Sequence, residues 1–195
     1  MLIVLDQDKT STGYSVRLLA GIFNISNPKT VNIGTGTNQV PKLTYVDDEI
    51  LNGPFGDIRG LQIGDDNADT AGIVTDLPAD AIIYADGINA HTNSQGTGNA
   101  ADVKALLLRH RTKNFFWSGD GGLIASSTST GSRSYPFKLG PYTNTSLGVT
   151  YPYYPVAKPD YGYGSASLPV YNSVLFANVM AWALRMAEEN GINTP

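Results

Sequence analysis

The chain has no cysteine among its 195 residues, which excludes disulfide bonds, thiolate metal sites and a cysteine nucleophile. Charge is also scarce, because Asp, Glu, Lys and Arg make up 15% of the residues, against about a quarter in a typical soluble domain. Glutamate is rarer still: of the 17 acidic residues, only Glu49, Glu188 and Glu189 are Glu. Since Glu is typical of helix surfaces and Asp of turns, we expect few exposed helices.

Long apolar runs and an excess of positive charge are missing too. No apolar run approaches the ~18 residues that a membrane span needs. Asp6 and Asp8 interrupt the first apolar run too early for a signal peptide. The formal net charge of -4 disfavours nonspecific binding of nucleic acid. We therefore expect no membrane or nucleic-acid partner, and a cytoplasmic location unless the protein belongs to a larger particle.

The apolar pattern predicts a single α/β domain over residues 1–195, with three layers and a short parallel or mixed sheet. Its clearest element is a C-terminal helix that begins at Asn172 or Ser173 and ends at Asn190-Gly191. Apolar residues recur there at helical spacing, namely Phe176, Val179, Met180, Ala183 and Ala187. Because nearly every side of this helix is apolar, we expect it to be buried within the domain or between subunits.

A second helix is expected between two buried strands. The strands are predicted at Ala81–Ala85 and Asn114–Ser118, where short apolar runs are bounded by turn residues. The helix is predicted over Ala100–Arg109, with one apolar stripe formed by Val103, Leu106, Leu107 and His110. A strand, a helix and a strand over this length form a βαβ unit, which implies a parallel pair.

The first third of the chain is less regular. Met1–Leu5 has the composition of a buried strand. Tyr14–Phe23 fits both the strand period and the helix period, and we favour a helix or a mixed segment. Further short strands are expected at Thr30–Ile33, Lys42–Val46 and Gly60–Ile63.

The segment 127–170 differs from the rest in composition. It holds six of the 11 prolines, and 135–171 holds eight of the 11 tyrosines. Because disordered segments lack aromatic residues, we expect a long ordered loop, packed on its own domain or on a neighbouring molecule. Tyrosine combines a large apolar area with a polar tip, which suits interfaces. The candidate interface residues are Tyr151, Tyr153, Tyr154, Tyr161 and Tyr163.

The order of the later elements resembles a known family. AIIYA (81–85), ADVKALLLRH (101–110), FFWSGDGG (115–122) and FANVMAWALRMA (176–187) follow one another as in the second half of glutamine-amidotransferase-like or ThuA-like domains. The last of these elements resembles their F-x-N-x-x-x-W helix through Phe176, Asn178 and Trp182. The resemblance covers roughly residues 80–190 and implies a flavodoxin-type three-layer fold. It does not extend to amidotransferase activity, whose nucleophile is a cysteine.

The N-terminal segment LIVLDQDKT matches the hhhhDxDxT pattern of haloacid-dehalogenase-type phosphatases. In that pattern Asp6 would be the nucleophile, because a carboxylate can form a phosphoaspartate, and Asp8 would be the general acid. Gly64–Asp69 (GDDNAD) fits the GDxxxD magnesium motif, and Lys42 is the candidate for the required lysine. The alternative is that both segments are turns that follow strands.

A calcium loop overlaps this second motif. Asp65, Asn67 and Asp69 have the alternate spacing of oxygen ligands in such a loop, with Asp76 at its twelfth position. However, the sixth position is Thr70 where calcium loops have glycine. Ca²⁺ or Mg²⁺ is thus a candidate ligand, a solvated turn is the alternative, and we expect no obligatory cofactor.

Further candidates lie at the ends of predicted strands. Ser118 lies in a glycine-rich turn, but WSGDG lacks the G-x-S-x-G pattern of a nucleophile elbow. The only candidates for its base are His91 and His110, and we expect His110 to be a packed histidine instead. In open α/β sheets ligands bind at the carboxyl ends of the strands, so Asp86 and Asp120 are expected to face one crevice.

These features favour a protein that is not an enzyme. Low charge, abundant tyrosine and long ordered loops are typical of proteins that function in assemblies. We therefore expect a structural or assembly protein that binds other protein subunits in a homo- or hetero-oligomer, most concretely a component of a virus or phage particle. Two alternatives remain, a hydrolase that uses Asp carboxylates at strand ends and a carbohydrate-binding module that uses the tyrosines as stacking platforms.

Overall fold

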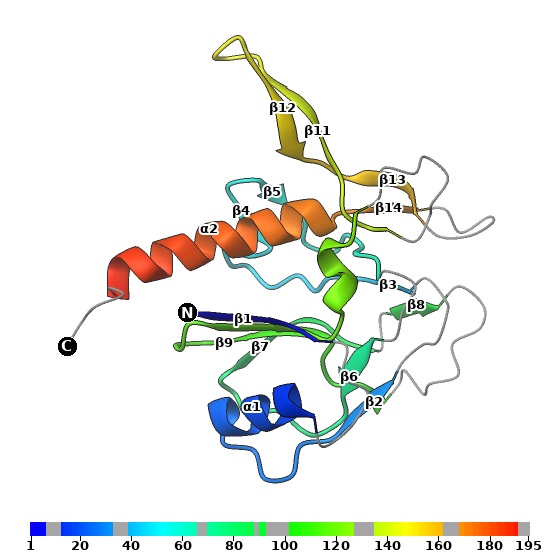
Figure 1. Cartoon of the computed structure of the whole chain (residues 1–195), viewed down its shortest axis with the longest axis vertical. Helices are drawn as coiled ribbons and strands as arrows, with labels where there is room; N and C mark the ends of the chain where they lie inside the picture. Colours follow the sequence, from blue (N-terminus) through cyan, green and yellow to red (C-terminus); the bar gives the residue numbers. More distant parts are fainter. Residues whose placement is uncertain are drawn as a thin grey trace.

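The computed structural model of the chain describes residues 1–6, 13–32, 39–65, 70–87, 90–92, 102–126, 135–161 and 168–190 (Figure 1). The two helices among these residues are α1 (Tyr14–Phe23) and α2 (Asn172–Asn190), and η2 (Gly121–Ile124) is a 3₁₀ turn. The longer strands are β1 (Leu2–Leu5), β7 (Ala81–Ala85), β9 (Leu107–His110), β10 (Phe115–Ser118), β11 (Leu139–Asn144), β12 (Val149–Pro155) and β13 (Lys158–Tyr161). The shorter strands are β2 (Thr30–Asn32), β3 (Gln39–Pro41), β4 (Asn52–Gly53), β5 (Gly56–Asp57), β6 (Ala71–Ile73), β8 (Ala90–Thr92) and β14 (Leu168–Val170).

The fold is mixed α/β, built on one four-stranded sheet and several two-stranded ones. The four-stranded sheet has the order β1-β10-β9-β7. β1 runs parallel to β10, while β9 is antiparallel to both of its neighbours. The remaining described pairs are β2-β6, β3-β8, β4-β5, β11-β12 and β13-β14.

Side chains alternate between two hydrophobic clusters on the two faces of the four-stranded sheet. On β10, Phe116 belongs to the cluster that contains Trp182 of α2, whereas Phe115 and Trp117 belong to the cluster that contains Leu19 of α1. The period of two along a strand explains this division. The helices therefore cover opposite faces of the sheet, as Figure 1 shows.

The helix predicted over Ala100–Arg109 is wrong, and the parallel βαβ unit is wrong with it. Leu107–His110 is instead strand β9, paired antiparallel with β7 and β10. Leu107 packs on the cluster of α2, and Leu108 packs on that of α1. A strand buried on both faces has a continuous apolar run, which periodicity alone cannot distinguish from a buried helix.

The C-terminal helix is confirmed over Asn172–Asn190. Its inner face carries large apolar side chains and two fully buried asparagines, Asn172 and Asn178. Not every side of it is covered within the chain, because Leu184 is 69% exposed.

The first third of the chain agrees in part with the expectation. The strands at the N-terminus and at Thr30 are confirmed as β1 and β2, although β1 is half-buried rather than fully buried. Tyr14–Phe23 is the helix α1. The strand predicted over Lys42–Val46 is wrong except for an isolated bridge between Lys42 and Gln62, which also replaces the strand predicted over Gly60–Ile63.

The long ordered loop predicted over 127–170 is corrected for the residues that the structure describes. They form two antiparallel strand pairs, β11-β12 and β13-β14. The β11-β12 hairpin projects from the body of the molecule beyond α2 (Figure 1). Asn144 and Gly148 make its turn: the Asn144 side chain accepts hydrogen bonds from the amides of Ser146 and Leu147, at 3.0 and 3.1 Å, and Gly148 has a φ of 63°.

Candidate functional site

Two buried carboxylates follow the neighbouring parallel strands β1 and β10. The amide of Asp6 donates to the carbonyl oxygen of Ser118 at 2.8 Å, so Asp6 extends the pairing of the two strands. The carboxylate of Asp6 accepts a hydrogen bond from the hydroxyl of Ser15 in α1. Oδ1 of Asp120 accepts one from the amide of Gly122 at 2.8 Å. Because carboxylates are rarely buried, this edge of the sheet is the first candidate site.

A third buried carboxylate, Asp65, adjoins the same edge. The side-chain amide of Asn172 donates to the carbonyl oxygens of Gly64, at 2.7 Å, and Leu123, at 3.1 Å. Asp65 therefore lies beside η2, the turn that follows β10. The hydroxyl of Tyr161 donates to the backbone carbonyl oxygen of Asp65 and lies 3.0 Å from Oδ1 of its carboxylate.

A cation site at this edge stays a prediction. Within the described ranges, no three His, Asp or Glu side chains gather closely enough to hold a metal ion. Asp8, Asn67 and Asp69 lie outside the described residues. Asp76 is an exposed residue with an ion pair to Lys104 at 3.7 Å.

Asp86 and Asp120 lie at one edge of the sheet but on either side of an intervening chain segment. The amide of Leu106 donates to the carbonyl oxygen of Ala85 at 2.8 Å, and its carbonyl oxygen accepts from the amide of Gly119 at 2.9 Å. Since neighbouring strands lie ~4.8 Å apart, the two backbones are about 10 Å apart. A ligand held by both carboxylates would therefore have to reach across Leu106.

Ser118 and His110 both have structural partners. The hydroxyl of Ser118 accepts a hydrogen bond from the amide of Asp120 at 3.2 Å and donates to its carbonyl oxygen at 3.1 Å, which closes the turn. Nδ1 of the buried His110 accepts from the amides of Thr112 and Lys113, at 3.1 and 3.0 Å. Burial, and then the charge of Lys113, lower the pKa of His110. The expected packed histidine is confirmed.

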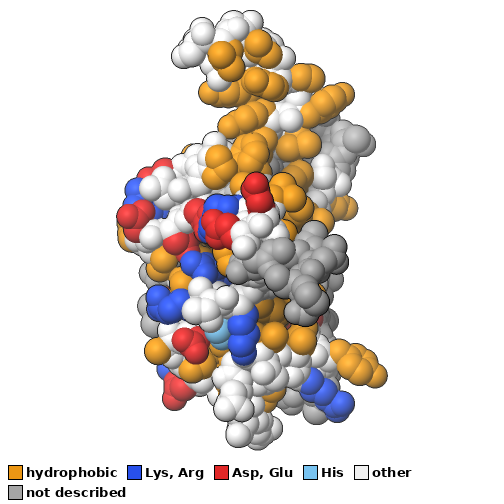
Figure 2. Space-filling view, turned by 90° about the vertical axis from the view of Figure 1, so that its left-hand side faces the viewer, with side chains coloured by type: hydrophobic (Ala, Val, Ile, Leu, Met, Phe, Trp, Pro, Cys, Tyr) orange, Lys and Arg blue, Asp and Glu red, His pale blue; other side chains and the backbone are white. Residues whose placement is uncertain are grey.

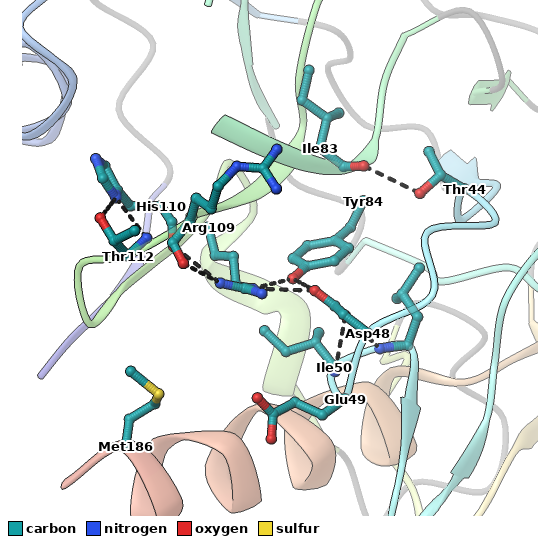
Figure 3. A network of polar contacts seen from close by, with 12 residues as sticks. Thr44, Asp48, Glu49, Ile50, Ile83, Tyr84, Arg109, His110, Thr112 and Met186 are labelled. Atoms are coloured by element: carbon teal, nitrogen blue, oxygen red, sulfur yellow. Dashed lines mark hydrogen bonds and ion pairs between the residues drawn. The ribbon is translucent and has the colours of Figure 1, made fainter. Parts of the chain in front are cut away.

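A polar network under α2 has a structural role. As Figure 3 shows, the hydroxyl of Tyr84 on β7 and the guanidinium of Arg109 on β9 converge on the carboxylate of Asp48. Nε of Arg109 lies 2.6 Å from the Tyr84 oxygen and 3.1 Å from Oδ2 of Asp48. The guanidinium also lies 5.7 Å from the ring centroid of Trp182. Burial, and then the Asp48 charge, raise the pKa of Tyr84, so its hydroxyl stays neutral and donates.

The second candidate site is the β11-β12 hairpin, Leu139–Pro155, which we call the arm. It contains no charged residue over its whole length. Figure 2 shows hydrophobic side chains gathered along its projecting part, where charged side chains are absent. Its exposed large side chains are Leu139, Tyr142, Leu147, Val149, Tyr151 and Tyr153.

Four aromatic rings form a ladder along one face of the arm. The ring centroids are 5.8 Å apart between Phe55 and Tyr154, 4.3 Å between Tyr154 and Tyr142, and 6.5 Å between Tyr142 and Tyr151. A bulge in β12 makes this possible, because Tyr142 pairs with Tyr151 while Gly140 pairs with Tyr154. The one extra residue brings Tyr151 and Tyr154 to the same face. The ladder thus connects the body of the domain to the projecting part of the arm.

The predicted interface tyrosines lie in different environments. Tyr151 and Tyr154 belong to the ladder. Tyr153 does not, and at 81% it is the most exposed of those that the structure describes. Tyr161 corrects the prediction, because it is fully buried and hydrogen-bonded to Asp65, so it lies in the interior and not on a contact surface. Tyr163 lies outside the described residues.

Sequence reasoning missed Tyr142 and Phe55 as ladder residues. The available signal was the segment Asn144–Gly148, since Asn and Gly between two β-branched and aromatic runs indicate a hairpin. That turn would have placed Tyr142 opposite Tyr151. Phe55 had no signal, because it is more than eighty residues away in the sequence.

The chain matches no protein-family model, no curated protein and no solved structure. Of the helices that the structure describes, none has the length and apolar character needed to cross a membrane.

Proposed function

We propose that this protein is a non-catalytic assembly protein that binds other protein subunits through its arm. The observation that supports this most is the aromatic ladder on an uncharged hairpin that projects from the domain. A two-stranded hairpin is only marginally stable in water unless its apolar face is packed against something. At the base of the arm Phe55 packs on Tyr154, but Tyr142 and Tyr151 remain about two-fifths exposed.

The faces of the arm, and not its edges, would make the contact. Pro141, Pro152 and Pro155 lie in its two strands. Proline has no amide hydrogen to donate, so these residues oppose the addition of a further strand. Buried aromatic side chains at the centre of an interface contribute about 2 kcal/mol or more each, which makes the ladder the expected centre of binding energy.

The most concrete setting is a virus or phage particle, in which subunits of the same or of different kinds meet through projecting arms. Within it, the chain would form one three-layer domain, with α1, the four-stranded sheet and α2 as its layers. Charge-poor surfaces that neighbours cover explain the low charge content of 15%.

The test compares two double variants of the arm. Y142S/Y151S removes exposed rungs of the ladder, whereas T143A/T150A alters the opposite face, where the two hydroxyl oxygens are 3.0 Å apart. We expect a defined oligomer for the parent chain and at least about a tenfold weaker association for the ladder variant, which corresponds to 1.4 kcal/mol. The control should associate like the parent. A monodisperse parent monomer whose arm resists proteolysis by itself would refute the proposal.

A carbohydrate-binding module is less well supported. Sugar binding requires exposed ring faces, and the ladder rings stack on one another at interplanar angles of 22° and 23°. Tyr161, one of the expected platforms, is buried.

A hydrolase remains a second candidate because Asp6 and Asp120 are both buried at the carboxyl ends of adjacent parallel strands. The discriminating variant is Asp120→Asn, which keeps an oxygen for the Gly122 amide but removes the charge. Magnesium-dependent hydrolysis of a phosphomonoester that D120N and D6N both abolish, without loss of stability, would favour this candidate. Absence of hydrolysis by the folded parent chain would exclude that phosphatase activity.

A further inference from the structure

The outer edge of β1 has backbone groups that no described strand uses. The amides of Leu2 and Asp6 donate toward β10, to Asn114 and Ser118, at 2.8 Å each. Because backbone groups alternate sides along a strand, the N–H and C=O groups of Ile3 and Leu5 point to the other side. Among the described strands, β1 pairs with β10 alone.

The opposite edge of the same sheet is covered, which makes the contrast informative. There the amide of Thr44 donates to the carbonyl oxygen of Tyr84 at 2.8 Å, and its hydroxyl donates to that of Ile83 at 3.1 Å. The segment before β4 thus protects β7 from further pairing. β1 has no such cover among the described residues.

β1 also lacks charge, proline and a bulge, three features that commonly prevent association at a sheet edge. Its sequence, LIVL, contains no charged residue and no proline, and Leu2 is 41% exposed. Native edge strands are normally protected by charge, proline or a bulge. The chemistry of this edge therefore matches an uncharged, extended, apolar strand.

We infer that the partner is a second copy of this chain, whose own β1 pairs with this edge in the antiparallel sense about a two-fold axis at Val4. β1 of a second copy is itself an uncharged, extended, apolar strand, so the two copies meet without like-charge repulsion. In the register centred on Val4, Ile3 of each copy lies opposite Leu5 of the other. Only this register lets the outward-pointing N–H and C=O groups of both residues form hydrogen bonds in both copies. The two four-stranded sheets then form one continuous sheet of eight strands.

This contact is isologous and closes on itself, so it yields a dimer and not a filament. It goes beyond the proposed function, because it uses a different surface from the arm and does not depend on it. A two-fold pair of chains would present two arms to other subunits.

The absence of cysteine makes the register directly measurable. In the V4C variant, the two thiols would face each other across the axis in a non-hydrogen-bonded pair, whose Cα atoms lie about 4.5 Å apart, within the range of a disulfide. Mild oxidation forms the S–S bond and transfers the two thiol hydrogens to the added oxidant. We expect V4C to cross-link on the order of a hundredfold faster than Y45C, because held thiols have an effective millimolar concentration. The site of this control is 73% exposed and follows Thr44, which covers the opposite edge of the sheet.

A mixture of I3C and L5C chains provides a second test of the register. In the proposed register these positions are opposite each other, so the mixed I3C–L5C dimer should exceed either self-linked dimer. The mixture also serves if V4C fails to fold. Cross-linking of V4C at the rate of Y45C overturns the inference, as does preferential self-linking of I3C or L5C. Repeating V4C in the Y142S/Y151S background separates this result from the fate of the proposed arm function.

Discussion

Asn178 is expected to be the most sensitive polar residue of α2. Its side chain is fully buried and makes three hydrogen bonds to the turn that contains β4 and β5. Oδ1 accepts from the amide of Phe55 at 3.0 Å, and Nδ2 donates to the carbonyl oxygens of Ile50 at 3.2 Å and Gly56 at 3.0 Å. Asn178→Ala leaves all three backbone groups without this partner. At about 1 kcal/mol for each hydrogen bond, the free energy of unfolding should fall by about 3 kcal/mol.

Urea unfolding followed by tryptophan fluorescence measures this change, because Trp182 lies one turn further along α2. The expected loss corresponds to a fall in Tm of roughly 6–12 °C for a chain of this size. Asn52→Ala is the matched control, since its exposed amide makes a single bond of 3.4 Å to Asp47, and it should change stability by less than about 0.5 kcal/mol. If N178A lost no more than N52A, the side chain would not be holding the turn.

Three further outcomes are expected from the same unfolding assay. Gly119→Ala should lower the free energy of unfolding by about 3 kcal/mol or more, because a Cβ there would overlap the carbonyl oxygen of Ala71. A stability near that of the parent chain would contradict this packing. Because the pKa of His110 is lowered in the folded state, the unfolded chain binds more protons as this histidine titrates. The free energy of unfolding should therefore fall as the pH drops from about 7 to about 5, and it should fall less in H110N. Arg109→Met should cost about 3 kcal/mol, against about 1 kcal/mol for Tyr84→Phe, because only R109M leaves the largely buried carboxylate of Asp48 without its cation. Equal losses would refute that difference.

The elements predicted correctly are those whose signals are local. The C-terminal helix has a cap, an apolar period and a glycine stop within its own sequence, and Ala81–Ala85 has turn residues at both ends. β9 could not be identified in this way, because both of its faces are buried by elements from distant parts of the chain. Leu107 and Leu108 are adjacent in the sequence, yet Leu107 belongs to the hydrophobic cluster of α2 and Leu108 to that of α1.

The candidate site shows the same limit. The strand-end positions of Asp6 and Asp120 followed from the predicted strands, and the structure places both carboxylates at the ends of paired strands. The separation of Asp86 from Asp120 by the chain at Leu106 could not be foreseen. It arises because Leu106 bonds to the strand ends at Ala85 and Gly119, whereas the sequence predicted a helix there. The ladder likewise depended on a bulge, which shifts Tyr154 to the face of Tyr142 and has no signature in the residue pattern.

The excess of Asp over Glu has a physical cause that bears on every Asp motif in this chain. Oδ1 of Asp48 accepts from the amide of Ile50 at 3.0 Å, Oδ1 of Asp57 from Arg59 at 3.1 Å, and Oδ1 of Asp120 from Gly122 at 2.8 Å. Each carboxylate caps the amide two residues further on, a geometry that the longer Glu side chain does not favour. A short Asp motif after a strand is therefore what turn formation alone would select here. For that reason, the charge and not the position of Asp120 is the property that separates a reactive site from a turn.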